Sequence, residues 1–126
     1  SNNMAIVNRI EKKIIVGKGE VIQYQILTYC FFNNIQISTS DLNCLYSLAL
    51  MEGVELTTFC EKISELGIFK SPQSCRNALS KAEKKGLIIK KGNNKKTISL
   101  NPDMEVQIEG TLFLDFKILG DESKEL

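Results

Sequence analysis

The stretch SPQSCRNALSKAEKKGLIIKKGNNKKTISL, residues 71–100, decides the fold. It opens with a strong helix-start signal, because Ser71 suits the N-cap and Pro72 suits the first helical position, where its missing N–H costs nothing. Apolar residues at helical spacing then predict a helix over 72–85, with Gly86 as its stop. The inner face of this helix is expected to carry small or apolar side chains: Cys75, Ala78, Leu79 and Ala82.

The period of the pattern changes from 3.6 to 2 after this helix. Residues 87–91 (LIIKK) and 96–100 (KTISL) read as two short strands, and residues 92–95 (GNNK) separate them. Glycine and asparagine tolerate positive φ, so this spacing predicts a β-hairpin with a basic tip. Pro102 is expected to end the second strand, because proline cannot donate to a sheet ladder.

Charge is strongly concentrated in the same part of the chain. Residues 70–100 hold nine basic residues against one acid, Glu83, which gives a net charge of +8. Residues 1–69 have a net charge of −2 and residues 101–126 of −5, so the total is only +1. Such asymmetry indicates a polyanionic partner. The alternative is a solvated lysine-rich surface, but that surface would normally interleave acids with the lysines.

Two further helices are expected before this stretch. Residues 39–53 fit a helix capped by Ser40, and residues 55–67 fit a shorter helix capped by Thr57 or Thr58. Each is expected to stop at a glycine, as helices often do: Gly53 and Gly67.

The order of three helices followed by a basic hairpin resembles the winged helix-turn-helix superfamily, over about residues 37–100. The most specific part is NALSKAEKKGLIIKKGNNKKTISL, which is similar to the end of the recognition helix and the wing of bacterial regulators. The resemblance implies an α+β fold in which helix 72–85 enters the major groove and wing 87–100 contacts the DNA backbone. The wing lacks the Asp-x-Arg of multiple-antibiotic-resistance regulators, and segment 66–71 is longer than a tight helix-turn-helix turn.

This reading predicts a DNA-binding protein, a transcriptional regulator, with double-stranded DNA as its partner. It is also compatible with a homodimer, since dimers of such regulators read two half-sites. Side chains that suit hydrogen bonds to base edges are Gln73, Ser74, Arg76, Asn77 and Ser80. Residues expected to contact the DNA backbone are Lys81, Lys84, Lys90, Lys91, Asn93, Asn94, Lys95 and Lys96. The alternative is a winged-helix protein-interaction module, or a replication or partition accessory protein without sequence-specific readout.

The two ends of the chain are less strongly patterned. We expect an N-terminal extension over 1–36 that packs on the core, the winged-helix domain over 37–102, an extended C-terminal segment over 103–120 and a disordered tail over 121–126. Within the extension, residues 12–16 and 21–27 fit a hairpin, whereas residues 21–32 fit a buried helix equally well.

Several functional classes are disfavoured by composition. The chain has no histidine and no recognisable catalytic motif, so we expect no enzymatic activity. Its four cysteines form no CxxC pair, so zinc, other metals and cofactors are not expected. Cys44 and Cys60 lie among apolar residues and fit small core side chains. The chain contains no run of about 18 apolar residues, so no membrane span is expected. Residues 1–3 before Met4 look like a cloning remnant, and without an export signal we expect a cytoplasmic protein.

Overall fold

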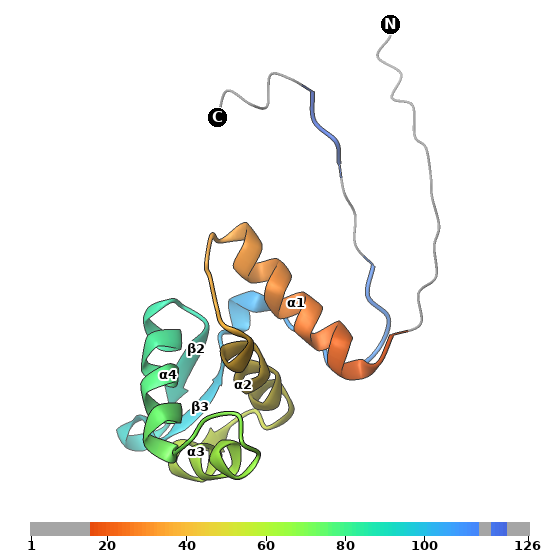
Figure 1. The fold of residues 1–126 in the computed structure, drawn as a ribbon. Helices are drawn as coiled ribbons and strands as arrows, with labels where there is room; N and C mark the ends of the chain where they lie inside the picture. Colours follow the sequence, from red (N-terminus) through yellow and green to blue (C-terminus); the bar gives the residue numbers. More distant parts are fainter. Residues whose placement is uncertain (1–15, 114–116, 121–126) are drawn as a thin grey trace, which may run out of the picture.

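The computed structural model describes residues 16–113 and 117–120, which form an α+β fold (Figure 1). Helix α1 (Lys18–Phe32) precedes a bundle of three helices: α2 (Thr39–Leu50), α3 (Leu56–Glu65) and α4 (Pro72–Lys84). The strands β1 (Val54–Glu55), β2 (Ile88–Lys91) and β3 (Thr97–Leu100) form an antiparallel sheet in the order β1-β3-β2. The predicted α+β class is therefore confirmed for the described part of the chain.

The N-cap of helix α2 lies two residues before the predicted one. Ser38, not Ser40, is the N-cap, so that prediction is wrong. The Ser38 hydroxyl accepts a hydrogen bond from the Asp41 amide at 3.0 Å, and the Asp41 carboxylate accepts one from the Ser38 amide at 3.1 Å. This capping box satisfies two amides at once, which an isolated cap at Ser40 would not do. The helix ends at Leu50, before Gly53.

Helix α3 starts without a side-chain cap, so the prediction of Thr57 or Thr58 as its N-cap is wrong. Glu55 is the N-cap residue and also the last residue of β1, whose two residues pair with β3. The Leu56 amide donates a hydrogen bond to the Lys96 carbonyl at 2.7 Å. A long-range hydrogen bond to the hairpin therefore satisfies an amide that a local side chain was expected to satisfy.

Helix α4 agrees closely with its prediction. The Ser71 hydroxyl accepts a hydrogen bond from the Ser74 amide at 3.1 Å, and Pro72 occupies the first turn. Beyond the last turn, Gly86 adopts a φ of 78°, which a residue with a side chain rarely does. Both predicted boundaries of this helix are confirmed within one residue.

Replacing Ser71 by alanine should lower the free energy of unfolding by about 1 kcal/mol, because the substitution removes the cap of α4. Urea denaturation of both proteins measures this difference. Ser80→Ala is a matched control on the exposed side of the same helix, and it should change stability by less than ~0.5 kcal/mol. Equal effects of the two substitutions would show that the cap does not stabilise the helix.

The predicted hairpin is also confirmed. Strands β2 and β3 pair from Ile88 opposite Leu100 to Lys91 opposite Thr97. The intervening residues 92–96, here called the β2–β3 loop, include a single 3-10 turn. Gly92 has a φ of 82° and Asn94 a φ of 59°, so the two residue types that tolerate positive φ occupy positions that require it.

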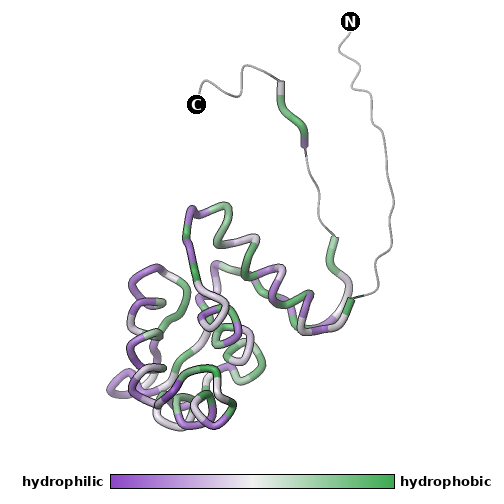
Figure 2. Tube along the Cα trace, viewed as in Figure 1, coloured by the Kyte–Doolittle hydropathy of each residue, from purple (hydrophilic) through white to green (hydrophobic). Residues whose placement is uncertain are grey.

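Helix α1 resolves the alternatives at the N-terminal end. Residues 21–32 are helical, so the hairpin alternative is wrong for residues 21–27, while residues 1–15 lie outside the described part. Ile22, Ile26 and Cys30 are buried in the core that α2, α3, α4 and the sheet share. The helix packs along α2, and its opposite face is exposed (Figures 1 and 2).

The C-terminal segment contacts α1 after a short 3-10 turn, η2 (Pro102–Met104), which buries Met104. The Gln25 amide nitrogen donates to the Gln107 carbonyl at 2.7 Å, and the Gln107 amide donates to Gln25 Oε1 at 2.6 Å. The described residues of the segment form no strand, and residues 114–116 and the tail 121–126 lie outside them. The Gln25 side chain thus forms one donated and one accepted hydrogen bond with the main chain of Gln107, as the main chain of a paired strand does.

Candidate nucleic-acid interface

Helix α4 turns an uninterrupted row of polar side chains to solvent. Cys75 and Leu79 are buried on its inner side. The opposite side carries exposed residues at i, i+4, i+7 and i+11, here called the polar stripe: Gln73, Asn77, Ser80 and Lys84. Four of the predicted site residues therefore share one face of one helix.

The two amides of the polar stripe are coupled. Gln73 Nε2 donates a hydrogen bond to Asn77 Oδ1 at 3.0 Å, across one turn of the helix. This contact orders both side chains while Gln73 Oε1 remains available as an acceptor and Asn77 Nδ2 as a donor. A free acceptor on Gln73 and a free donor on Asn77 match in kind the donor and acceptor that adenine presents in the major groove.

Ser74 and Arg76 do not lie on the polar stripe. The Ser74 hydroxyl is half-buried, 3.0 Å from the Ser71 hydroxyl, so it belongs to the helix start. The Arg76 guanidinium donates a hydrogen bond to Thr57 Oγ1 on α3 at 2.6 Å. The side chain of Arg76 is thereby held toward α3, at the flank of α4 rather than at its outermost face.

A hollow of about 300 Å³ lies beside that flank. We call it the basic hollow, and its lining residues come from the start of α3, from α4 and from the β2–β3 loop: Glu55, Leu56, Thr57, Arg76, Asn94, Lys95 and Lys96. Three cations from two distant parts of the sequence thus line one open hollow, with a single carboxylate among them. Sequence reasoning missed Glu55 and Thr57, because no local pattern signals which side chains α3 brings to the loop.

The single acid of the basic stretch is engaged by a lysine of the hairpin. Glu83 Oε1 lies 3.4 Å from Lys90 Nζ, and the side chain of Lys90 is half-buried. Lys90 therefore acts partly as a link between α4 and β2. Lys91 and the loop residues Asn93, Asn94, Lys95 and Lys96 are all exposed. The charge available to an external partner thus comes mainly from the loop and from the outer part of α4.

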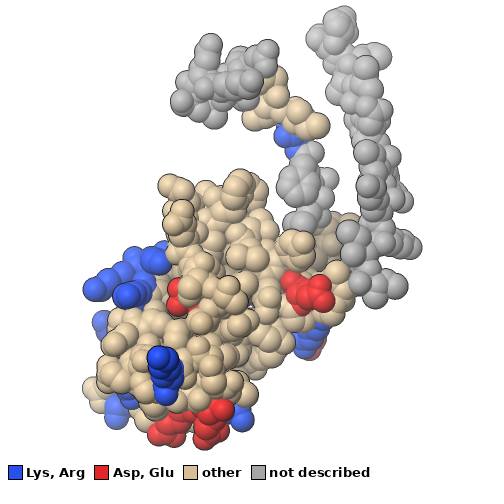
Figure 3. All heavy atoms as spheres, in the orientation of Figure 1, with Lys and Arg blue, Asp and Glu red and all other residues tan. Residues whose placement is uncertain are grey.

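Basic side chains gather along one side of the molecule (Figure 3). In this view they lie where α4 ends and where the β2–β3 loop turns, while acidic side chains show at the end that α3 occupies and near α1. Many of the basic side chains visible in this view therefore share one side of the molecule, while a few lie near α3 and α1. Such a surface attracts a polyanion over distances of about a Debye length.

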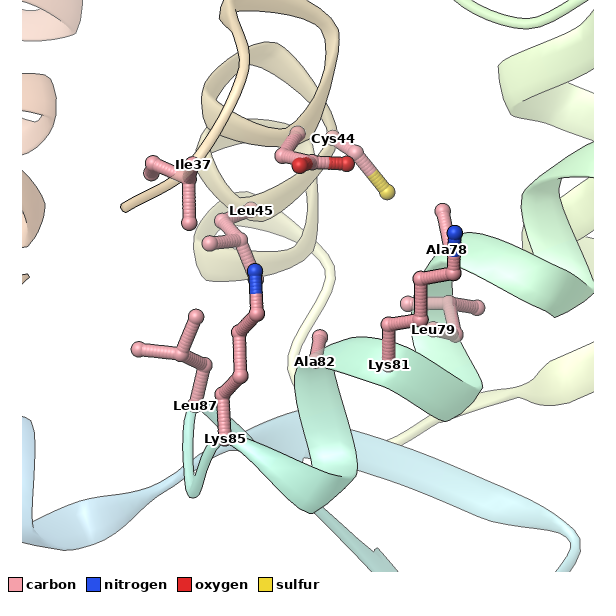
Figure 4. A pocket seen from close by; sticks show the side chains of 10 residues that line it. Ile37, Cys44, Leu45, Ala78, Leu79, Lys81, Ala82, Lys85 and Leu87 are labelled. Carbon is pink, nitrogen blue, oxygen red and sulfur yellow. The ribbon is translucent and has the colours of Figure 1, made fainter. Parts of the chain in front are cut away.

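Lys81 lies at the other flank of α4, over a shallow depression against α2 (Figure 4). Apolar residues such as Ile37 and Leu45 line this depression, which has a free volume of only about 10 Å³. Lys85 extends beside it and donates a hydrogen bond to the Gln36 carbonyl at 2.9 Å. The depression is too small for a ligand, since even one water needs about that volume.

All four cysteines are free and buried, which confirms the prediction that Cys44 and Cys60 are core side chains. Cys44, Cys60 and Cys75 come one each from α2, α3 and α4. Burial, with a hydrogen bond to Cys75, raises the pKa of Cys60 to about 12. A hydrogen bond to Cys44 and burial also raise the pKa of Cys75. Cys60 and Cys75 therefore stay protonated, and the three side chains pack the centre of the helical bundle.

No group of His, Cys, Asp or Glu within the described residues is arranged to hold a metal ion. Within the same residues, no helix combines the length and the apolar character needed to cross a bilayer. Comparisons with protein-family models, with curated proteins and with solved structures found no match for this chain.

Proposed function

We propose that the protein binds double-stranded DNA with α4 and the β2–β3 loop, and that it acts as a transcriptional regulator. The order helix, strand, helix, helix, hairpin supports this proposal, because it is the order of a winged helix-turn-helix. The pairing of β1 with β3 supports it further, since this pairing places the start of α3 beside the hairpin.

The observation that carries the proposal is the basic hollow beside the polar stripe. A duplex offers base edges in its groove and phosphates at the groove's rim, and specific binding needs contacts to both. The polar stripe has the amides for the first task, and the basic hollow has the cations for the second. The two surfaces adjoin because Arg76 lies on the flank of the same helix.

The arrangement also revises the roles within the site. We assign base contacts to Gln73, Asn77 and Ser80, which are exposed at the outer face of α4. Arg76 is assigned to a phosphate rather than to guanine, because its guanidinium is held by Thr57 and lines the basic hollow. Lys84, Lys91, Asn93 and the other exposed basic residues of the site contribute further backbone contacts.

Binding to a random duplex is expected to weaken steeply with salt. Neutralising about six phosphates predicts a slope near −5 for the logarithm of the association constant against the logarithm of salt concentration. Fluorescence anisotropy with a labelled duplex at several salt concentrations measures this slope. A flat salt response would rule out the electrostatic mechanism proposed here.

A matched variant tests the distinct role of the polar stripe. Asn77→Ala removes an amide but no charge, so it should leave the salt slope for random DNA unchanged. Against a duplex selected for tight binding, the same substitution should cost about 1–3 kcal/mol of discrimination. Loss of affinity for both duplexes alike would show that Asn77 does not read sequence.

A further inference from the structure

The basic hollow has one side chain whose presence DNA binding does not explain. The Glu55 carboxylate lines the hollow with Arg76, Lys95 and Lys96, yet in the described part of the chain it forms no ion pair with them. It does not cap helix α3 either, although Glu55 is the N-cap residue. A carboxylate only accepts hydrogen bonds, and a DNA backbone has no hydroxyl to donate one. Glu55 therefore suits a ligand that carries hydroxyl groups.

The cations of the hollow are ready to receive an anion. The Arg76 guanidinium donates to Thr57 Oγ1 at 2.6 Å, which orients it and uses one of its N–H groups. Among the described residues, its other N–H groups and the ammonium groups of Lys95 and Lys96 have no acceptor. A guanidinium beside ammonium groups is a common phosphate-binding arrangement. A phosphate can therefore enter without breaking an ion pair.

The hollow has the size of a small-ligand site. Its volume is about 300 Å³, at the lower end of the range of roughly 300–1,000 Å³ that is usual for such sites. One water molecule takes about 30 Å³ of liquid, so a phosphate group alone would leave much of this space unfilled. The Asn94 amide and the Thr57 hydroxyl also line the hollow and offer further polar contacts. The remaining space thus fits a small polar body attached to the phosphate.

We propose that the basic hollow binds a small phosphate monoester that carries hydroxyl groups, a sugar phosphate in chemical class. Its phosphate contacts Arg76, Lys95 and Lys96, and one of its hydroxyl groups donates to Glu55. A second anionic group on the ligand would be repelled by Glu55, so compounds with several phosphates are disfavoured. The ligand uses cations that the proposed function assigns to DNA, so it should compete with a duplex. Only this competition rests on the proposed function.

Isothermal titration calorimetry of the full chain at fixed ionic strength tests the proposal with ribose 5-phosphate, inorganic phosphate and ribose as probes. Ribose 5-phosphate should bind about tenfold more tightly than inorganic phosphate, because a hydrogen bond from a hydroxyl to a carboxylate is charge-assisted. Ribose lacks the phosphate and should show no binding at millimolar concentration. This order of affinities separates a built site from general attraction of anions.

Two variants test the two halves of the site. Glu55→Ala should abolish the preference for ribose 5-phosphate over inorganic phosphate, since it removes the acceptor but no cation. Arg76→Gln should weaken the binding of both phosphates by about tenfold or more. Glu61→Ala and Lys62→Gln are matched controls, because these exposed residues of α3 do not line the hollow, and both should bind like the wild type. Circular dichroism checks that each variant stays folded.

Equal affinity of the wild type for ribose 5-phosphate and inorganic phosphate would overturn the proposal, and so would a preference that survives Glu55→Ala. An equal loss in Lys62→Gln would overturn it too, by showing that only net charge matters. In fluorescence anisotropy, ribose 5-phosphate should release a labelled duplex, and simultaneous binding of both would place the ligand outside the hollow. Duplex binding without ribose 5-phosphate binding would overturn this proposal alone. The reverse result would leave it standing and overturn the proposed function.

Discussion

Reversing two charges of the basic hollow, with Arg76→Glu and Lys95→Glu combined, should weaken binding to duplex DNA by at least about 100-fold at low salt. Each substitution removes a cation that neutralises a phosphate and puts a carboxylate in its place. The two new carboxylates would join Glu55 in the same hollow, so the hollow would repel the backbone instead of binding it. Juxtaposed like charges cost several kcal/mol at an interface.

Fluorescence anisotropy with a random duplex measures this loss. Lys18→Glu is the matched control, since Lys18 is an exposed lysine at the start of α1, on another side of the molecule. A carboxylate is also favourable at a helix N-terminus, so the control should fold normally. Wild-type affinity in the double variant would show that the basic hollow is ordinary surface. An equal loss in Lys18→Glu would show that only total charge matters.

Replacing Ile26 by alanine should lower the free energy of unfolding by about 2–5 kcal/mol, the usual cost of such a truncation at a buried site. Ile26 is fully buried where α1 packs against α2, so the substitution leaves a cavity in the core that all the helices share. Because α1 belongs to this core, the variant should still unfold in a single cooperative transition.

Urea denaturation followed by far-ultraviolet circular dichroism checks both expectations. Leu66→Ala removes the same number of carbon atoms from an exposed position just after α3 and should cost less than ~0.5 kcal/mol. A separate early transition in Ile26→Ala, with the remainder as stable as wild type, would contradict the prediction. It would mean that α1 is an appendage and not part of the domain.

Local signals in the sequence were sufficient where neighbouring residues determine the structure. Ser71, Pro72 and Gly86 bracket α4 correctly, because a cap, a fixed φ and a positive φ each act within one helical turn. The same holds for the β2–β3 hairpin, whose loop has a glycine and an asparagine at two of its three positions of positive φ, Lys95 being the third.

Other local signals were outweighed by partners that the pattern does not show. Ser40 and the two threonines were reasonable caps, but Ser38 forms a reciprocal box, and the first amide of α3 bonds to the Lys96 carbonyl of the β2–β3 loop. Strand β1 has only two residues, too few for any periodicity to reveal it. Helix α1 and a hairpin strand were likewise equally compatible with its continuous apolar run.

Composition and local pattern were enough to predict the charge of the candidate interface, the helix that presents it and the hairpin beside it. These features depend on composition and on contacts within about one helical turn. Long-range packing, in contrast, brings Arg76 to Thr57 and makes it line one hollow with Lys95 and Lys96. The reason is physical: these side chains meet because the start of α3 is hydrogen-bonded to the β2–β3 loop through Leu56 and Lys96, and both lie beside Arg76 of α4. Such packing follows from burial of the whole core and not from any one stretch of residues.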